Sequence, residues 1–375
     1  MSTEAFSRLS TRVVEFIGCG AGQPEAATEA RFNELALEAF ALQCERVPTY
    51  HRLCSARGVA PDRVAHWTEL PALPTIAFKE FDVTSLAPEE RTRVFHSSGT
   101  TVGQPGRHFH DEASLAVYEV ALRPWFQAHV LPETLAPGGK RLRLLVLTPP
   151  AEGVPNSSLA HMFAVAVREW GTADSAFLAA PGADGAWLLR WAAALAVLRE
   201  AETAGQPVCL LGTAFSFVHL LDHLEAAGMR LNLPAGSRVL ETGGYKGRSR
   251  EVPKSELHAL IKKRLGLPAS HILCEYGMSE LGSQAYDGVV GAGAMTAVSR
   301  VFHFPPWARV CVVSPETGRE VGEGETGLLR IVDLANVRSV IAIQTEDLAA
   351  RRGGGFELVG RVPQTGPRGC SLMVG

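Results

Sequence analysis

Residues 95–108 read FHSSGTTVGQPGRH, and no other stretch says as much about the fold. Its backbone N–H groups and hydroxyl donors, combined with little side-chain bulk, suit a loop that closes over a polyphosphate. Glycine lets the backbone approach a ligand closely, and Arg107 can neutralise phosphate charge. Taken alone, the same residues fit an ordinary surface loop at least as well. A Walker A loop is excluded because its G-K-[ST] ending is missing.

A resemblance favours the phosphate-loop interpretation. The pattern S-S/T-G-T-T-G-x-P-K/R is typical of the adenylate-forming superfamily, which includes acyl-CoA synthetases, peptide-synthetase adenylation domains and luciferases, and residues 97–107 resemble it. The resemblance implies a loop that binds ATP, with Arg107 in a catalytic role. The loop residues that it assigns to ATP are Ser97, Ser98, Gly99, Thr100 and Thr101.

The bulk composition is that of an ordinary soluble enzyme, with 375 residues, 46% of them hydrophobic and 20% charged. The 36 basic and 39 acidic side chains nearly balance, so the chain lacks the excess of positive charge that is typical of nucleic acid binding. No apolar run approaches the roughly 18 residues of a membrane span, and the N-terminus lacks the pattern of a secretory signal. Seven scattered cysteines without a C-x-x-C pair fit a reducing cytosol. We therefore expect a cytoplasmic protein with no membrane or nucleic acid partner.

Hydrophobic periodicity predicts an alternation of strands and helices. Short buried strands are expected at residues 142–147, 208–211, 238–241 and 271–275. Helices are expected at residues 185–201, 214–227 and 253–265, and over 28–56 a helix that Pro48 ends before a turn. This alternation favours a layered α/β fold with parallel sheets. Beyond Arg309, short strands at residues 310–313, 327–332, 340–343 and 356–359 predict a smaller β-rich subdomain.

A second motif, EYGMSE at residues 275–280, directly follows an expected strand. The carboxyl end of a parallel strand is where α/β sheets place ligands. There Tyr276 can stack on a purine, Ser279 can donate to a phosphate, and Glu280 can hold a Mg²⁺ ion that bridges phosphates. The alternative is a polar turn whose tyrosine packs on the sheet edge. The segment also resembles the Y-G-x-T/S-E motif of adenylate-forming enzymes, which adds Gly277 to the implied ATP site.

A glycine pair precedes this motif, as it does in the superfamily. Residues 241–246 read ETGGYK and place Gly243 and Gly244 after an expected strand, where a loop can pass flat against a purine or an acyl group. As an isolated Gly-Gly turn the segment would be uninformative.

Two elements near the end of the chain complete the series. Residues 344–347 read QTED, end another β-run and resemble the [S/T]-G-D element, with Glu346 in place of glycine. Asp347 would then accept hydrogen bonds from both ribose hydroxyls, although a solvated acidic turn explains it equally when it is taken alone. Arg361 follows Gly360 as in the family's hinge, where the arginine would contact ribose or phosphate.

The details are similar to a narrower family, the acyl-protein synthetases, which form the ligase component of the bacterial bioluminescence fatty-acid reductase complex. The segments that carry this resemblance are HSSGTT at 96–101, ETGGYK at 241–246, EYGMSEL at 275–281 and RGCSL at 368–372, with FNELA at 32–36 and VPTY at 47–50. It covers nearly the whole chain. It implies ATP and Mg²⁺ as cofactors and a carboxylic acid as substrate. It also implies an acyl-acceptor protein, a reductase or an acyl carrier protein, as partner.

Three further residues are interpreted through this resemblance. Cys370 occupies the position of the family's C-terminal cysteine, which accepts the acyl group; a thiolate suits that step, and a small residue in a frayed terminus is the alternative. His161 corresponds to a region near the carboxylate, with a core histidine or a serine helix cap as alternatives. Cys274, inside an expected strand, is interpreted as a packing cysteine.

We expect an adenylate-forming domain over residues 1–307, a β-rich subdomain of the same unit over 308–361, and a tail over 362–375 that carries Cys370. Only this tail follows Arg361, so we expect the mobile C-terminal domain of ordinary members, with its lysine, to be lacking. Charge stabilisation would then rest on Arg107, Mg²⁺ and loop backbone, or on another protein. Two other functions stay open: an acyltransferase that moves an acyl group from coenzyme A to a carrier-protein thiol, and a non-catalytic scaffold.

Overall fold

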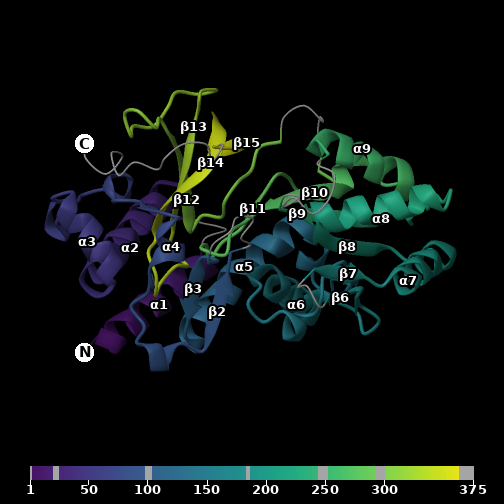
Figure 1. Cartoon of the computed structure of the whole chain (residues 1–375), viewed down its shortest axis with the longest axis horizontal. Helices are drawn as coiled ribbons and strands as arrows, with labels where there is room; N and C mark the ends of the chain where they lie inside the picture. The colour runs from purple at the N-terminus through teal and green to yellow at the C-terminus, as the bar shows by residue number, and fades with distance from the viewer. Residues whose placement is uncertain are drawn as a thin grey trace.

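The computed structural model describes residues 2–19, 25–97, 104–182, 186–243, 252–292 and 300–362. Figure 1 shows an elongated arrangement with two sheets. The N-terminal helices and the sheet built by the last strands lie at one end, and the other sheet with its helices extends toward the opposite end. The candidate site residues come from the elements where these two parts meet.

The first sheet has six strands. Its strands, in spatial order, are β11 (Ala285–Tyr286), β10 (Ile272–Tyr276), β9 (Arg238–Thr242), β8 (Val208–Thr213), β4 (Arg143–Val146) and β5 (Ala176–Phe177). All neighbouring pairs are parallel except β10 with β11. Strands β4, β8, β9 and β10 are buried along their whole length, which is typical of a parallel sheet covered on both faces.

Helices cover this sheet on two sides. Leu210 of β8 packs in a cluster with α7 (Trp191–Ala204), α8 (Ala214–Ala226) and α9 (Lys254–Leu265). Its neighbour Leu211 packs in another cluster with α5 (Glu112–Val130) and α6 (Ser158–Trp170). Because successive strand residues point to opposite faces, the two helix layers lie on opposite sides of the sheet. The α/β fold with a parallel sheet is thereby confirmed.

The second sheet joins both ends of the chain. Its strands are β12 (Ala308–Val313), β13 (Thr326–Asp333), β14 (Ala342–Arg352), β15 (Gly355–Arg361) and β1 (Leu73–Pro74). The later strands are antiparallel neighbours, whereas β1 pairs with β14 in parallel. Its core is shared with the N-terminal helices α1 (Ser2–Cys19), α2 (Glu25–Arg46) and α3 (Pro48–Ala56). The expected domain limits of 307, 308–361 and 362 stay a prediction.

Smaller elements lie outside the two large sheets. The remaining strands are β2 (Arg93–His96), β3 (Arg107–His110), β6 (Ala179–Pro181) and β7 (Trp187–Leu189), and a short helix α4 spans Ala77–Glu80. Short 3-10 turns lie at Pro61–Arg63, Trp67–Glu69, Pro88–Glu90, Pro132–Leu135, Ala151–Gly153 and Ala269–His271. Strands β2 and β3 form an antiparallel hairpin. The glycine-rich loop of residues 98–103, which lies between them in sequence, is outside the described residues.

Three expectations about single elements were wrong. Residues 48–56 form the helix α3 rather than a turn, because a proline is tolerated at the first helical position, as Pro48 is here. The helix expected from residue 185 begins at Trp191, since residues 187–189 pair with β6 instead. The strand expected at 340–343 runs from Ala342 to Arg352, so the segment 344–347 lies inside β14 and does not end it. The helix expected at residues 253–265 does end at Leu265, and Gly266 follows it with φ +73°.

None of the described helices is both long and apolar enough to span a bilayer.

Candidate functional site

Two of the predicted loops leave the same edge of the first sheet. Strands β9 and β10 are parallel neighbours, with Glu275 opposite Thr242. Thr242 and Gly243 therefore leave the sheet beside Glu275 and Tyr276, at the end where α/β sheets place ligands. Gly243 has φ +71°, a conformation that favours glycine. Gly244 lies outside the described residues.

A hydrogen-bond chain links three of the predicted residues across three strands. The phenolic O–H of Tyr276 donates to Oδ2 of Asp347 at 2.7 Å, and Nε of Arg361 donates to Oδ1 at 2.8 Å. Asp347 and Arg361 are cross-strand partners in β14 and β15. Burial and the nearby carboxylate of Asp347 raise the pKa of Tyr276 well above its usual value. The phenol therefore stays a donor near neutral pH.

The tyrosine ring is fixed by packing. The ring packs in T-shaped arrangements with Phe302, Phe304 and Phe356, at centroid distances of 5.2 to 6.2 Å. Tyr276 is only 7% exposed. The ring and its hydroxyl thus present one defined orientation at the sheet edge.

Glu280 lies against the two ends of the glycine-rich loop. A Cβ atom built on Gly106 would stand 2.8 Å from Oγ of Ser97 and 2.9 Å from Oε1 of Glu280. Ser97 and Gly106 also bind each other, through Gly106 N–H to Ser97 Oγ at 2.8 Å and Ser97 N–H to Gly106 O at 2.9 Å. The structure thereby brings Ser97 and Glu280, 183 positions apart in the sequence, into one place. Ser98, Gly99, Thr100 and Thr101 lie outside the described residues.

The carboxylate of Glu280 is buried, and this burial raises its pKa. The hydroxyl of Ser279 donates to its Oε2 at 2.9 Å. In the described parts of the chain, no three His, Cys, Asp or Glu side chains converge as in a structural metal centre. Mg²⁺ does not require such a centre, because it is usually bound through one or two carboxylates, waters and substrate phosphates. Glu280, a desolvated carboxylate beside a phosphate-type loop, fits that role.

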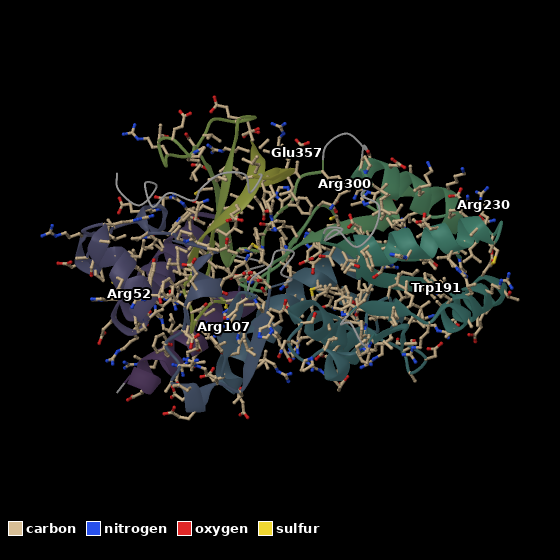
Figure 2. The ribbon with its side chains drawn as sticks, viewed as in Figure 1. Arg52, Arg107, Trp191, Arg230, Arg300 and Glu357 are labelled. Atoms are coloured by element: carbon tan, nitrogen blue, oxygen red, sulfur yellow. The ribbon has the colours of Figure 1, made fainter. Side chains whose placement is uncertain are left out.

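Arg107 begins β3, immediately after the loop. Its guanidinium lies 2.9 Å from Oδ1 of Asp82. Both side chains are about one-third exposed, so this pair contributes little to stability and can exchange partners. Figure 2 shows Arg107 in the middle part of the molecule, between Arg52 of the N-terminal helices and the distant Trp191 of α7.

His161 stands in the first turn of α6, whose N-terminus is capped by Ser157. Its Nε2 lies 3.2 Å from Oε1 of Glu119, and its ring lies 5.5 Å from Phe95 at the start of the loop. Burial lowers the pKa of His161, and the charge of Glu119 opposes this shift. The structure thus places His161 near the loop, together with the serine cap that the sequence left open.

The sequence did not identify several buried groups around these residues. Glu241 is fully buried and lies 3.1 Å from Nζ of Lys254 and 3.0 Å from Nε2 of His258. Burial alone would raise the pKa of Glu241, but these two neighbours lower it to about 2. Next to it, burial raises the pKa of Glu275 to about 7, although the Thr242 hydroxyl donates to that carboxylate. No local pattern marks such pairs, because they form only between elements.

Of the two cysteines interpreted from the sequence, the structure describes Cys274 but not Cys370. Cys274 is fully buried in β10, contacts Lys254 and has a pKa raised well above that of a free thiol, chiefly by burial. This supports its interpretation as a packing residue. Cys370 lies outside the described residues, so its role stays a prediction.

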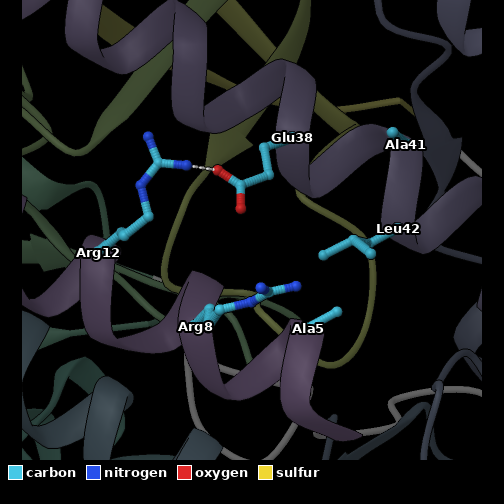
Figure 3. A pocket seen from close by; sticks show the side chains of 6 residues that line it. All are labelled: Ala5, Arg8, Arg12, Glu38, Ala41 and Leu42. Carbon is cyan, nitrogen blue, oxygen red and sulfur yellow. Dashed lines mark hydrogen bonds and ion pairs between the residues drawn. The ribbon is translucent and has the colours of Figure 1, made fainter. Parts of the chain in front are cut away.

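One open groove lies away from all of these residues. It has a volume of about 410 Å³ and is lined by Ala5, Arg8, Arg12, Glu38, Ala41 and Leu42 of α1 and α2 (Figure 3). Arg12 forms an ion pair with Glu38 across it. None of the candidate site residues contributes to this groove.

Solved structures share the fold. The structure of 2-hydroxyisobutyryl-CoA ligase with 2-HIB-AMP in the postadenylation state has a TM-score of 0.61 and 14% identity, over 92% of this chain and 70% of that one. Its open conformation with 2-HIB-AMP and CoA has a TM-score of 0.60 and 14% identity, over 91% and 77%. At such low identity the likeness concerns the fold alone, which this chain shares with that ligase.

The sequence comparisons give the family. The model of the family "acyl-protein synthetase, LuxE" matches residues 24–375, so this chain belongs to the acyl-protein synthetases. The long-chain-fatty-acid–luciferin-component ligase of Vibrio harveyi is 22% identical in an alignment of 191 residues that covers 48% of this chain and 48% of that protein. The match thus spans about half the length of this curated relative. The family resemblance inferred from the motifs is confirmed.

Proposed function

We propose that this chain activates a carboxylic acid with ATP and Mg²⁺ as an acyl adenylate and transfers the acyl group to the thiol of Cys370. From there the group passes to a partner protein in the cytoplasm, either a reductase or an acyl carrier protein. The observation that carries the proposal is that the side chains of Glu280 and Ser97 both lie against Gly106, beside the glycine-rich loop. Membership of the acyl-protein synthetases supports the same chemistry.

Nucleotide binding is supported by the Tyr276–Asp347–Arg361 chain. Each carboxylate oxygen offers more than one lone pair, so Asp347 can accept from two ribose hydroxyls while Tyr276 and Arg361 hold it in place. Arg361 also acts electrostatically on Glu280, lowering its pKa against the effect of burial. Arg361 therefore adds positive charge to the proposed site.

In the first step, a carboxylate oxygen of the acid attacks the α-phosphorus of ATP, and the bond to pyrophosphate breaks. Glu280 would hold the Mg²⁺ ion, which would supply positive charge against the phosphate oxygens. Ser97 donates to phosphate from the edge of the loop, and Arg107 exchanges Asp82 for the developing charge. His161, neutral because burial lowers its pKa, orients the acid by hydrogen bonding.

In the second step, the thiolate of Cys370 attacks the acyl carbon and AMP leaves. The thioester is then attacked by a nucleophile of the acceptor protein, and the Cys370 thiol is regenerated. A thiolate is the most nucleophilic ordinary side chain near neutral pH, and an acyl adenylate has a good leaving group.

Exchange of radioactive pyrophosphate into ATP, dependent on the added acid, tests the first step. We expect Glu280→Ala to lower the exchange rate by about 100-fold, since even outer-shell partners of a metal contribute about 10–100-fold. Glu316→Ala, an exposed position in the turn after β12, is the matched control. Acid-dependent exchange that survives at full rate in Glu280→Ala would contradict the proposed metal site. Labelling from acyl-CoA without ATP would instead indicate a transferase.

Cys370→Ser separates the two steps. It should keep acid-dependent exchange at the wild-type rate, because the thiol acts only after the adenylate has formed. It should also abolish the hydroxylamine-sensitive label left on the protein by radioactive acid and ATP. Cys19→Ser, an exposed cysteine in α1, is the control. If the label persists in Cys370→Ser, another nucleophile carries the acyl group.

A further inference from the structure

His108 lies on β3, directly after the glycine-rich loop, and both of its ring nitrogens are engaged. Its Nδ1 lies 2.8 Å from the carbonyl oxygen of Ser279, and its Nε2 lies 3.0 Å from Oγ of Ser339. The residue is 2% exposed. The rings of Phe78 and His110 hold the imidazole at centroid distances of 5.9 and 4.3 Å. These two polar contacts and two ring contacts together fix the orientation of the imidazole.

These partners define the tautomer. A carbonyl oxygen can only accept, so Nδ1 must carry the hydrogen and donate to Ser279. In the neutral ring Nε2 is then an acceptor, and the hydroxyl of Ser339 donates to it. The imidazole thus donates a hydrogen bond to Ser279 and accepts one from Ser339, and the two contacts can be removed separately.

The contact with Ser279 bears on Glu280. The carbonyl of Ser279 is held by His108, and the carbonyl of Glu280 accepts from Nδ2 of Asn336 at 2.9 Å. Two consecutive carbonyls are therefore tied down by buried side chains. Since the hydroxyl of Ser279 also donates to the carboxylate of Glu280, the direction of this carboxylate is set by the same turn.

We propose that His108 is a positioning residue: by donating from Nδ1 to the Ser279 carbonyl, it holds the Glu280 carboxylate against the ends of the glycine-rich loop, where the magnesium–polyphosphate group binds. The inference rests on the proposed function, because it needs Glu280 to be the metal ligand. It adds His108 as the residue that links β3, the strand after the loop, to Glu280. A histidine that merely fills the core would satisfy the same carbonyl without any effect on the metal.

Three substitutions separate these roles. His108→Asn places an amide N–H near the position of Nδ1 and keeps the contact with Ser279. His108→Gln places its amide near Nε2 and keeps only the contact with Ser339. Ser339→Ala removes the Nε2 contact and leaves Nδ1 untouched.

The measurement is acid-dependent pyrophosphate exchange at saturating ATP, titrated with free Mg²⁺. We expect His108→Gln to raise the half-saturating Mg²⁺ concentration by about 10–100-fold, as outer-shell partners of metals do, with an unchanged KM for the acid. His108→Asn and Ser339→Ala should stay within about threefold of the wild type. Equal behaviour of the Asn and Gln variants, or Mg²⁺ curves that coincide with the wild type, would overturn the inference. If the wild type itself shows no exchange, the proposed function fails instead.

A measurement on the unaltered chain covers the case in which His108→Gln does not fold. Nitrogen NMR of ¹⁵N-histidine protein should show His108 with hydrogen on Nδ1. Its resonance should move when Mg²⁺ and a non-hydrolysable ATP analogue are added together, and not with the analogue alone. Hydrogen on Nε2, or a resonance indifferent to Mg²⁺, would refute the positioning role.

Discussion

At the residue scale, the site depends on close contacts between residues that are far apart in the sequence. Gly106 shows this most directly, because the space beside its Cα is occupied by Ser97 Oγ and Glu280 Oε1. Glycine is required there by packing and not by its backbone, since Gly106 is absent from the glycines with positive φ. Any side chain at this position would separate the loop from the carboxylate.

We therefore expect Gly106→Ala to lower acid-dependent pyrophosphate exchange by at least about tenfold. Its methyl group must displace Ser97 or Glu280, and overpacking of this kind costs about 1–3 kcal/mol. Gly354→Ala, whose methyl group would meet nothing within 4 Å, is the matched control. Exchange assays and thermal melts of both variants check this. A wild-type exchange rate in Gly106→Ala would show that the contact has no role in activity.

The sequence could predict the residues with motif-like surroundings but not their partners. Tyr276, Glu280, Asp347 and Arg361 belong to short recognisable strings, and the structure describes all four. Their partners are dispersed: Asn336 reaches Glu280 from 56 positions away, and His108 reaches Ser279 across 171. Such contacts leave no local periodicity, so only the folded chain can reveal them.

At the element scale, the parallel strands were predictable because they are short, apolar and bounded by turns. The full length of strand β14 could not be predicted in the same way, because the polar residues 344–347 interrupt its apolar pattern. Thr345 and Asp347 are nevertheless buried, since the Thr345 hydroxyl donates to Leu329 and Asp347 accepts from Tyr276 and Arg361. Hydrogen bonding thus replaces apolarity as the reason for burial, and hydrophobicity alone cannot detect that.

Glu275, which is buried in β10 beside β9, makes the stability of the protein depend on pH. The pKa of Glu275 is raised from 4.5 to about 7, so its protonated form stabilises the fold fully below pH 4.5, and this contribution is lost as the pH rises through 7. Glu275→Gln should therefore gain about 2–3 kcal/mol over the wild type between pH 5 and pH 8, at 1.36 kcal/mol per pKa unit. Urea unfolding at both values measures this. The exposed Glu15→Gln is the control, and a difference independent of pH would contradict the assignment.

At the scale of the whole molecule, the two ends of the chain form one core. The side chain of Gln43 in α2 is fully buried, donates to the carbonyl of Asn336 and accepts from the N–H of Ile341. Strand β1 adds a parallel pairing to β14. The β-rich region therefore does not pack by itself, which the change in pattern after Arg309 did not indicate.

Gln43→Ala should destabilise the whole molecule. It leaves a buried carbonyl and a buried N–H without partners, and each such group costs about 1–3 kcal/mol. Gln127→Ala, which removes one half-buried hydrogen bond to Thr134, is the matched control. Calorimetry should show a lower melting temperature for Gln43→Ala with a single transition retained. Two separate transitions would mean that the N-terminal helices and the second sheet unfold independently.

The closure of this core by β14 has a consequence for biosynthesis. The core around the first three helices includes strands from the final fifth of the chain as well as α5 and residues 67–83. On the ribosome these helices therefore emerge long before the last part of the surface that shields them. Nascent chains that stop short of residue 342 should depend on chaperones and be cleared by proteases, so premature termination would yield no folded fragment of the N-terminal region.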